Sequence, residues 1–446
     1  MAPTGPDLAT LLHQAGLLDH GGADWLKAAP QLRGDYASDA AAFTRFWQQG
    51  DALLEKLPPK ESTAVAITAN CRAARERFLG AHAETLYRAL TGDLKTFVRV
   101  EHLVIEAGRA VPGLVPSPEA LAAENTHDQK DKRGLEIDQG LFLNHVLAHP
   151  VAGAHLCHAM LLPRPEALDR LAQFRQRGTI ELATATVERR GRAAIVTLRN
   201  PRFLNAEDGT TLDEAEIAID IATLDPDAAV AVLRGGTVEH PKYRGKRIFS
   251  AGINLTHIYR GKIPYVWYMQ RDLGLVNKIF RGLAREDASP DEIAGGTVEK
   301  PWIAQVDGFA IGGGCQLLLA MDYVIAASDA YMTLPARKEG IIPGAANLRM
   351  PRFVGDRIAR QAILYGRRLD CASPEGRLIC DEIAAPDAID AALDTVIAGL
   401  TDSGVVSAAG NRRALRVGQE PLDLFRRYMA VYAREQAYCH FSPALI

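Results

Sequence analysis

The 446-residue chain lacks several features that would place it in an obvious class. No CxxC pair occurs among its six scattered cysteines, and a chain of this size does not need disulfide staples, so we expect reduced thiols. No run of 18 or more apolar residues is present, so no membrane-spanning helix is predicted. The net charge of −3 argues against a broad nucleic-acid surface. No signal peptide is recognisable, and we expect a cytoplasmic protein.

Metal-binding motifs are also missing. Four of the twelve histidines and one cysteine lie within fourteen residues, but no H-E-x-x-H or H-x-D/E element accompanies them. Pro150 and Gly153 interrupt the helix that would carry them, so no metal is predicted. Cys315 begins a helix, where a thiol can be acidic, but we interpret it as a packing residue. The members of the cluster are His145, His149, His155, Cys157 and His158.

The pattern of apolar residues changes along the chain. The length predicts two or three domains, and the first part has the spacing of helices. The charge run at 128–133 is expected to be a solvated loop. From about residue 178, short apolar strands alternate with helices, which is typical of an α/β layer fold. The clearest predicted helices cover 39–57, 63–90, 141–162, 211–224 and 421–438.

Two glycine-containing segments are the first candidates for a functional site. They are I-F-S-A-G-I-N-L at 248–255 and V-D-G-F-A-I-G-G-G-C-Q-L at 306–317. Three consecutive glycines at a helix start leave backbone N–H groups bare and let a ligand approach closely. The same helix end presents a positive dipole to a developing oxyanion. Taken alone, Gly312, Gly313 and Gly314 fit a tight strand-to-helix turn equally well.

Four motifs in register give a more specific indication. They read R-N-P-R-F-L-N-A, F-S-A-G-I-N-L, K-P-W-I-A-Q-V-D-G-F-A-I-G-G-G-C-Q and I-P-G-A, and begin at Arg199, Phe249, Lys300 and Ile342. In order and spacing they resemble the crotonase (enoyl-CoA hydratase/isomerase) superfamily. The resemblance covers about residues 180–385.

The resemblance implies an α/β fold with a crotonase-type β-β-α spiral core. We expect this acyl-CoA-binding catalytic core at 178–385, after an N-terminal α-helical domain at 1–177. The remaining residues, 386–446, would form a C-terminal helical oligomerisation region. Relatives of this kind form trimers or dimers of trimers, so a homotrimer or homohexamer is expected, with no nucleic-acid or membrane partner.

The resemblance also assigns site residues. The backbone N–H groups of Ile253 and Gly313 would form an oxyanion hole for the thioester oxygen of an acyl-CoA. Each such hydrogen bond is worth roughly 2–4 kcal/mol of barrier. A basic cluster just upstream is either a solvated loop or a contact for CoA phosphates; it comprises Lys242, Arg244, Lys246 and Arg247. The further predicted substrate-binding residues are His240, Lys242, Tyr243, Ala251, Gly252, Asn254, Leu255 and Gly314.

Two departures from the family pattern narrow the reaction. Hydratases of the family use two glutamates, one after the glycine triplet and one after the proline of the next strand. This chain has Gln316 and Ala336 there. Neither residue can serve as a general acid or base near neutral pH, so simple hydration is disfavoured. Gln316 remains a predicted active-site residue because its amide can hydrogen-bond a substrate or water.

Three further residues are candidates for the acyl pocket. Glu207 either binds a phenolic hydroxyl or transfers a proton, or else it lies on the surface at a helix N-terminus. Arg271 lies in an aromatic stretch and either reads a substrate hydroxyl or pairs with a glutamate elsewhere. Ile341, like Ile253, Leu255 and Ile342, would either form an apolar wall of a dry site or belong to the packed core.

Together the motifs resemble one branch of the superfamily, the arylacetyl-CoA oxygenases that use neither metal nor organic cofactor. Such enzymes remove the α-proton of (3,5-dihydroxyphenyl)acetyl-CoA and stabilise the enolate, which reacts with O2. The peroxide then attacks the thioester carbonyl, CoA leaves and (3,5-dihydroxyphenyl)glyoxylate results. Two other functions stay open: isomerisation or thioester hydrolysis of another acyl-CoA, and silent acyl-CoA binding. The group that accepts the α-proton does not follow from the sequence.

Overall fold

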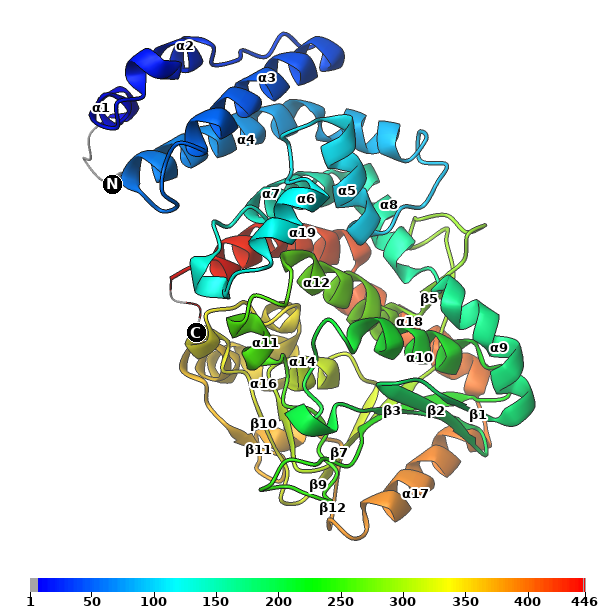
Figure 1. Ribbon diagram of the computed structural model, residues 1–446. Coiled ribbons are helices and arrows are strands. Elements are labelled where there is room, and N and C mark those ends of the chain that lie inside the picture. Colours follow the sequence, from blue (N-terminus) through cyan, green and yellow to red (C-terminus); the bar gives the residue numbers. More distant parts are fainter. Residues whose placement is uncertain (1–6, 444, 446) are drawn as a thin grey trace.

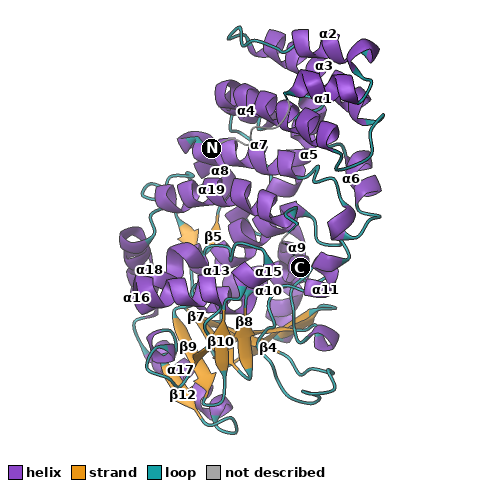
Figure 2. Cartoon of the chain, turned by 90° about the vertical axis from the view of Figure 1, so that its left-hand side faces the viewer, coloured by secondary structure: helices purple, strands orange, loops and turns teal. Residues whose placement is uncertain are grey.

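The first helices of the chain and the strands lie at opposite ends of the molecule. The computed structural model describes residues 7–443 and 445. In Figure 1 the helices between residues 7 and 148 lie above, and the strands gather below with further helices around them. Figure 2 shows the same division from the side. The mixture of a parallel sheet with helices confirms the predicted α/β class.

The N-terminal part is helical, as predicted. The helices expected over 39–57 and 63–90 are α3 and α4, and α3 turns Phe43, Phe46 and Trp47 into the core. Trp25 stacks on Phe46 with ring centroids 5.0 Å apart. The elements are α1 (Leu8–Gln14), α2 (Gly22–Lys27), α3 (Tyr36–Leu54), α4 (Ser62–Leu90), α5 (Val100–Ala110), α6 (Pro118–Glu124), α7 (Ile137–Ala148), α8 (Pro150–Leu161) and α9 (Pro165–Arg177).

Two predictions for this part need correction. The helix predicted over 141–162 is two helices, because Pro150 lacks the N–H that a continuous helix would need and His149 caps the start of α8. The charge run at 128–133 is not solvated throughout, since the ammonium of Lys132 is buried 3.8 Å from a Glu136 carboxylate oxygen. A short 3₁₀ helix at 129–131 lies within this run.

No single described helix is both long and apolar enough to cross a membrane. Two consecutive helices joined at a sharp bend do meet the same criteria of length and composition when they are taken together. They cover residues 137–148 and 150–177, with an angle of 109° at the break.

The main sheet has the strand order β1-β2-β3-β4-β7-β9-β12. The pairs from β3 to β12 are parallel, whereas β1, β2 and β3 form antiparallel neighbours. Strand β7 is buried along its whole length, as expected when both faces of a parallel sheet are covered. The strands are β1 (Thr179–Glu181), β2 (Ala185–Arg190), β3 (Ala193–Leu198), β4 (Val230–Gly235), β7 (Trp302–Val306), β9 (Tyr323–Ala327) and β12 (Glu382–Ala384).

A second, small sheet lies beside the glycine segments. It has the order β11-β10-β8, in which β8 and β10 are parallel. Its strands are β8 (Phe309–Ile311), β10 (Tyr331–Thr333) and β11 (Leu369–Asp370); β5 (Leu283–Ala284) and β6 (Thr297–Val298) form a separate pair. Because β8 runs directly into the glycine triplet, this sheet fixes the start of the helix that follows.

The helices after β3 surround the sheets. They are α10 (Leu212–Leu224), α11 (Leu255–Tyr259), α12 (Tyr265–Gln270), α13 (Val276–Arg281), α14 (Gly313–Leu318), α15 (Ala336–Glu339), α16 (Ala346–Tyr365), α17 (Ile389–Asp402), α18 (Val405–Gln419) and α19 (Leu422–His440). The last of them, α19, returns to the N-terminal part: the amide of Asn144 on α7 donates to the Ala430 carbonyl at 2.7 Å. In Figure 1 this helix, in red, lies between the N-terminal helices and α12.

Candidate active site

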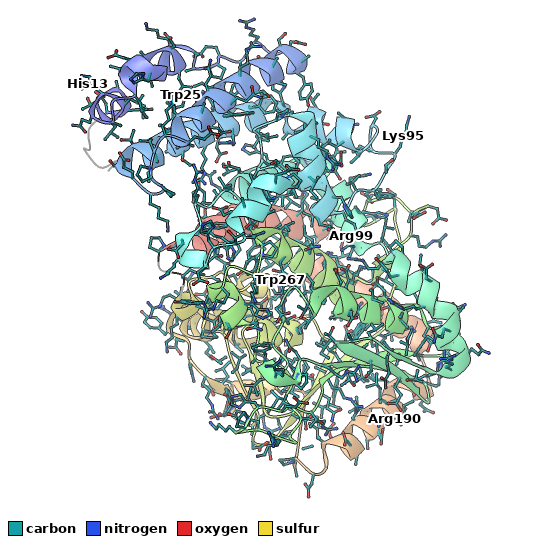
Figure 3. All side chains as sticks on the ribbon, viewed as in Figure 1. His13, Trp25, Lys95, Arg99, Arg190 and Trp267 are labelled. Atoms are coloured by element: carbon teal, nitrogen blue, oxygen red, sulfur yellow. The ribbon has the colours of Figure 1, made fainter. Side chains whose placement is uncertain are left out.

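A cavity collects several of the predicted residues. It lies beneath α12, whose Trp267 is labelled near the middle of the molecule in Figure 3. The predicted residues that line it are Glu207, Ile253, Arg271, Gly313, Gln316 and Ile341. They share the lining with Trp267, Tyr268, Asp272, Gly312, Leu334, Ala336, Glu339, Ile342, Pro343, Gly344 and Tyr432.

The segment before Glu207 is held in an uncommon conformation. Leu204 and Asn205 both have positive φ, at 56° and 55°. The buried amide of Asn205 compensates by donating to the carbonyls of Gly236 and Ile248 at 2.8 and 2.7 Å. This explains why an asparagine stands in the first motif, and it brings Glu207 to the edge of the second motif.

Glu207 and Ile253 form an isolated parallel bridge. Its hydrogen bonds run from Glu207 N to Gly252 O at 2.7 Å and from Asn254 N to Glu207 O at 2.8 Å. This pattern uses the backbone groups on either side of Ile253 and leaves its own N–H unused. Within the described part of the chain, the N–H groups of Ile253 and Gly313 donate to no acceptor.

The glycine triplet brings these two amides together. Gly312 has φ 50° and ψ −112°, a conformation that a side chain would strain. A Cβ added to Gly252 would lie only 2.6 Å from the Ile311 carbonyl oxygen and 3.0 Å from the Gly313 nitrogen. The two loops therefore touch through backbone atoms, and Ile253 and Gly313 both line the cavity.

Arg271 organises the polar side of the cavity. It begins a five-residue π-helix, Arg271–Leu275, between α12 and α13, and such π-helical turns are often found at functional sites. All five of its N–H donors have acceptors. Nε and Nη2 donate to the Glu207 carboxylate at 3.0 and 2.8 Å, Nη2 also to the Gly313 carbonyl, and Nη1 to Asp272 and Gln316.

This network answers two questions that the sequence left open, the location of Glu207 and the partner of Arg271. Glu207 is not a surface glutamate, because only 7% of it is exposed and it lines the cavity. Arg271 pairs with this glutamate inside the protein, so its guanidinium has no N–H left for a ligand in this arrangement. The amide nitrogen of Gln316 remains without an acceptor among the described residues, while its oxygen accepts from Arg271 at 2.8 Å.

The fourth motif closes the cavity behind this network. A Cβ on Gly344, which has φ 44°, would lie 2.5 Å from Asp272 Oδ1 and 2.6 Å from Gln316 Oε1. Only glycine therefore lets the chain pass so close to these two polar groups. Burial raises the pKa of Asp272, although the neighbouring Arg271 and a hydrogen bond from Tyr432 oppose this shift.

Several cavity residues were not found from the sequence. Asp272 directly follows Arg271, and Tyr432 comes from α19, far away in the chain. Glu339 lies three residues after Ala336, the position without the expected glutamate. Since residues three apart share a helix face, this spacing was a signal that Glu339 could reach the same place.

Other predicted residues lie beside the cavity without lining it. Ala251, Gly252 and Gly314 belong to the touching backbone segments. The side chain of Asn254 caps α11 and donates to Asp208 at 2.9 Å, so its polar atoms are already occupied. Leu255 begins α11 and is partly exposed.

The basic loop lies apart from the cavity. Lys242, Arg244 and Lys246 are exposed, whereas Arg247 pairs with Asp307 and Asp390. Lys242 places its ammonium 5.1 Å from the centre of the Tyr243 ring, and the His240 ring lies 5.9 Å from the same ring. A surface hollow in this loop is lined by Arg202, Glu239, His240, Pro241 and Arg244.

Cys315 packs inside the protein, as interpreted from the sequence, and two of the clustered histidines pair with glutamates. Cys315 is fully buried, and burial raises the pKa of its thiol to about 12. His145 and His149 pair with Glu76 and Glu84. No group of three or more His, Cys, Asp or Glu side chains in the described ranges is arranged to hold a metal ion.

Comparison with known proteins gives matches over most of the chain. The family model described as enoyl-CoA hydratase/isomerase matches residues 188–416. A (3,5-dihydroxyphenyl)acetyl-CoA 1,2-dioxygenase from Amycolatopsis orientalis is 44% identical over 92% of this chain and 94% of its own length. A probable enoyl-CoA hydratase from Rhizobium meliloti is 30% identical over 46% of this chain and 70% of its own length. Among solved structures, an enoyl-CoA hydratase from Mycobacterium avium subsp. paratuberculosis is 24% identical and covers 60% of this chain and 97% of its own, with a TM-score of 0.49.

Proposed function

Because this chain belongs to the enoyl-CoA hydratase/isomerase family, we propose that it is a dioxygenase that acts on (3,5-dihydroxyphenyl)acetyl-CoA. The similarity to the Amycolatopsis orientalis enzyme extends over 92% of the chain and therefore includes the N-terminal helices as well as the core. The observation that carries the proposal is the cavity in which two unused amides face a buried cluster of Glu207, Arg271 and Gln316.

The overall reaction balances without another reactant. Arylacetyl-CoA and O2 give arylglyoxylic acid and free CoA, and both oxygen atoms enter the acid. Loss of an α-proton gives the enolate, which is oxidised by O2 to an α-peroxide. The peroxide oxygen then attacks the thioester carbonyl and expels the CoA thiolate. Opening of the resulting ring breaks the O–O bond, removes the second α-hydrogen as a proton and leaves the ketone and the carboxylate.

The N–H groups of Ile253 and Gly313 would hold the thioester oxygen. Donors that are fixed before the reaction stabilise the negative charge as it develops, and a single one can contribute about 3–4 kcal/mol. The arrangement supports this role because the bridge to Glu207 and the left-handed Gly312 leave both N–H groups without an acceptor in the described protein.

The polar cluster would recognise the hydroxyl groups of the aromatic ring. The Glu207 carboxylate accepts hydrogen bonds, and the free amide nitrogen of Gln316 donates one. Arg271 fixes both side chains and so defines where the hydroxyls must lie. An unsubstituted phenyl ring would leave the amide nitrogen of Gln316 without an acceptor, which is a basis for rejecting it.

The remaining walls would provide a dry space for O2. Ile253, Leu334, Ile341 and Ile342 are apolar and line the same cavity. The electrons that reduce O2 come from the substrate enolate, so the proposed reaction needs neither metal nor organic cofactor. Ala251, Gly252, Asn254, Leu255 and Gly314 would border the pantetheine path, and His240, Lys242 and Tyr243 would contact the nucleotide end of CoA.

For the protein in the cell we propose a cytoplasmic homotrimer or homohexamer. All six cysteines are free thiols, which fits a reducing compartment. Exposed apolar side chains on the helices around the core, Tyr365, Val406 and Leu415, are suited to contacts between subunits. Light scattering of the purified protein would give the number of subunits.

The test is simultaneous measurement of O2 uptake and thiol release with (3,5-dihydroxyphenyl)acetyl-CoA in the presence of a chelator. We expect equal amounts of O2 consumed and thiol released, with the arylglyoxylate as the product. Thiol release without O2 uptake would instead identify a thioester hydrolase. Migration of a double bond in another acyl-CoA would identify an isomerase, and binding without any product would identify a silent acyl-CoA-binding protein.

A further inference from the structure

Glu339 is the one carboxylate of the cavity lining that the described protein leaves without a partner. It ends the short helix α15, and only 9% of it is exposed. Within the described residues, no hydrogen-bond donor or cation contacts its carboxylate, whereas Glu207 and Asp272 both bind Arg271. A buried carboxylate without a partner destabilises the fold, so its presence in a cavity indicates a function.

Its position relative to the glycine triplet is specific. Oε2 of Glu339 lies 3.9 Å from the point where a Cβ on Gly312 would stand. The next residue is Gly313, whose N–H would hold the thioester oxygen. The α-carbon of an acyl-CoA is two bonds from that oxygen, so with the thioester held at Gly313 it would lie in the cavity that Glu339 also lines.

The short helix explains how the carboxylate reaches this place. Ala336 and Glu339 both line the cavity and lie three residues apart on α15. The small side chain of Ala336 leaves open the space that a glutamate at that position would fill. The carboxylate approaches from one helical turn further along, while Arg337 and Lys338 point to solvent.

We propose that Glu339 is the catalytic base that removes the α-proton, and this proposal rests on the function proposed above. The Cα–H bond breaks, an O–H bond forms on the Glu339 carboxylate, and the electron pair moves into the thioester carbonyl. The resulting enolate oxygen accepts hydrogen bonds from the N–H groups of Ile253 and Gly313. No oxidant takes part in this step, so it can occur before O2 binds.

The surroundings of Glu339 favour a base over a structural anion. Burial raises the pKa of Glu339 to about 7, which is suitable for proton transfer near neutral pH. Tyr268 on α12 and Tyr432 on α19 line the same cavity, and among the described lining residues Arg271 is the only cation. Because Arg271 is saturated by Glu207, Asp272, Gln316 and a backbone carbonyl, it does not hold Glu339 in the ionised state.

Proton exchange without oxygen isolates this step. Wild-type protein is incubated anaerobically in D2O with (3,5-dihydroxyphenyl)acetyl-CoA, and NMR follows replacement of the α-hydrogens by deuterium. We expect Glu339→Gln to exchange roughly 10²- to 10⁴-fold more slowly, with substrate affinity changed by less than about threefold. Glu435→Gln, the same substitution at an exposed position on α19, should exchange at the wild-type rate.

A pH profile provides a second readout that a structural role would not alter. In the wild type the exchange rate should rise through about pH 7. Glu339→Asp should keep this rise at a lower rate, and Glu339→Gln should lose it. Exchange by Glu339→Gln at the wild-type rate would overturn the proposal, and loss of exchange in Glu207→Gln alone would assign the base to Glu207.

The outcome is separable from that of the proposed function. If the wild type consumes O2 and Glu339→Gln still exchanges normally, the function stands and the base is another group. If the wild type exchanges protons but consumes no O2, the oxygenase function is wrong, and the same variants still decide whether Glu339 is the base.

Discussion

The guanidinium of Arg271 holds the carboxylate of Glu207 through Nε at 3.0 Å and Nη2 at 2.8 Å, with both side chains buried. The same guanidinium also binds the carbonyl of Gly313, the residue whose N–H would contact the thioester oxygen. One side chain thus links Glu207, proposed to bind the ring, to Gly313, proposed to form part of the oxyanion hole. Any change in Arg271 should therefore affect folding and catalysis together.

We expect Arg271→Met to lower the free energy of unfolding by about 3–5 kcal/mol, because it leaves the Glu207 carboxylate buried and uncompensated. Urea titration measures this effect, and kcat/KM should also fall as Glu207 and Gln316 lose their fixed positions. The matched control is Arg285→Met, since Arg285 and Asp287 form an exposed pair. An equal loss of stability in both variants would show that the buried pair of Arg271 and Glu207 stabilises the fold no more than the exposed pair does.

We expect Gly313→Ala to lower kcat roughly 10²- to 10³-fold, the effect of losing one oxyanion donor. The added methyl group would overlap the Glu207 carboxylate and lie 3.0 Å from Arg271 Nη2, so the loop carrying the N–H must shift. Steady-state kinetics on the acyl-CoA substrate measures the change. Gly399→Ala, in a helix with open space around the glycine, should keep full activity and gain a little stability.

The sequence predicted the parts of this site that depend on local backbone conformation. Gly312, Gly252 and Gly344 occupy left-handed or crowded positions that permit few other residues, so their motifs could be recognised without a structure. Glu339 and Tyr432 could not be placed in the same way. The three-residue spacing from Ala336 indicates only that Glu339 shares a helix face with it, and the approach of Glu339 and Tyr432 to the cavity depends on how α15 and α19 pack.

Arg271 illustrates the same limit at a single residue. The sequence indicated that a buried arginine among aromatics needs a polar partner, but it left a substrate hydroxyl and a glutamate as equal candidates. Glu207 and Arg271 lie 64 residues apart in the chain. They meet through tertiary contacts, namely the bridge between Glu207 and Ile253 and the direct ion pair of Glu207 with Arg271.

Stability should depend on pH through His440, which lies behind Tyr268 of the cavity with Nδ1 3.3 Å from the phenol oxygen. Burial, together with the nearby Lys132, lowers the pKa of His440 from 6.5 to about 3, against the hydrogen bond to the Ile263 carbonyl. Between these two values the unfolded chain binds a proton that the folded chain does not, so stability falls as the pH falls through this window. This residue should contribute a loss of up to about 1.4 kcal/mol per pH unit.

Urea midpoints of the wild type and His440→Gln at pH 7, 6 and 5 measure this contribution. We expect the free energy of unfolding of His440→Gln to fall less steeply with falling pH, the difference in slope being the contribution of His440. His13→Gln, at an exposed position on α1, should follow the wild type. Parallel curves for the wild type and His440→Gln would exclude the histidine as a source of the pH dependence.

Ring recognition should be visible as a difference between two substrates. If the free amide nitrogen of Gln316 and the carboxylate of Glu207 bind ring hydroxyls, Gln316→Ala should lower kcat/KM for (3,5-dihydroxyphenyl)acetyl-CoA by about 10- to 100-fold, equivalent to about 1–3 kcal/mol. The same variant should change kcat/KM for phenylacetyl-CoA little, because that ring has no hydroxyl to lose. Comparing O2 uptake for both substrates in wild type, Gln316→Ala and Glu207→Gln measures how much each side chain contributes to binding the ring hydroxyls. An equal loss for the two substrates would mean that these side chains support the cavity without contacting the ring, since a purely structural defect cannot distinguish a hydroxylated ring from a bare one.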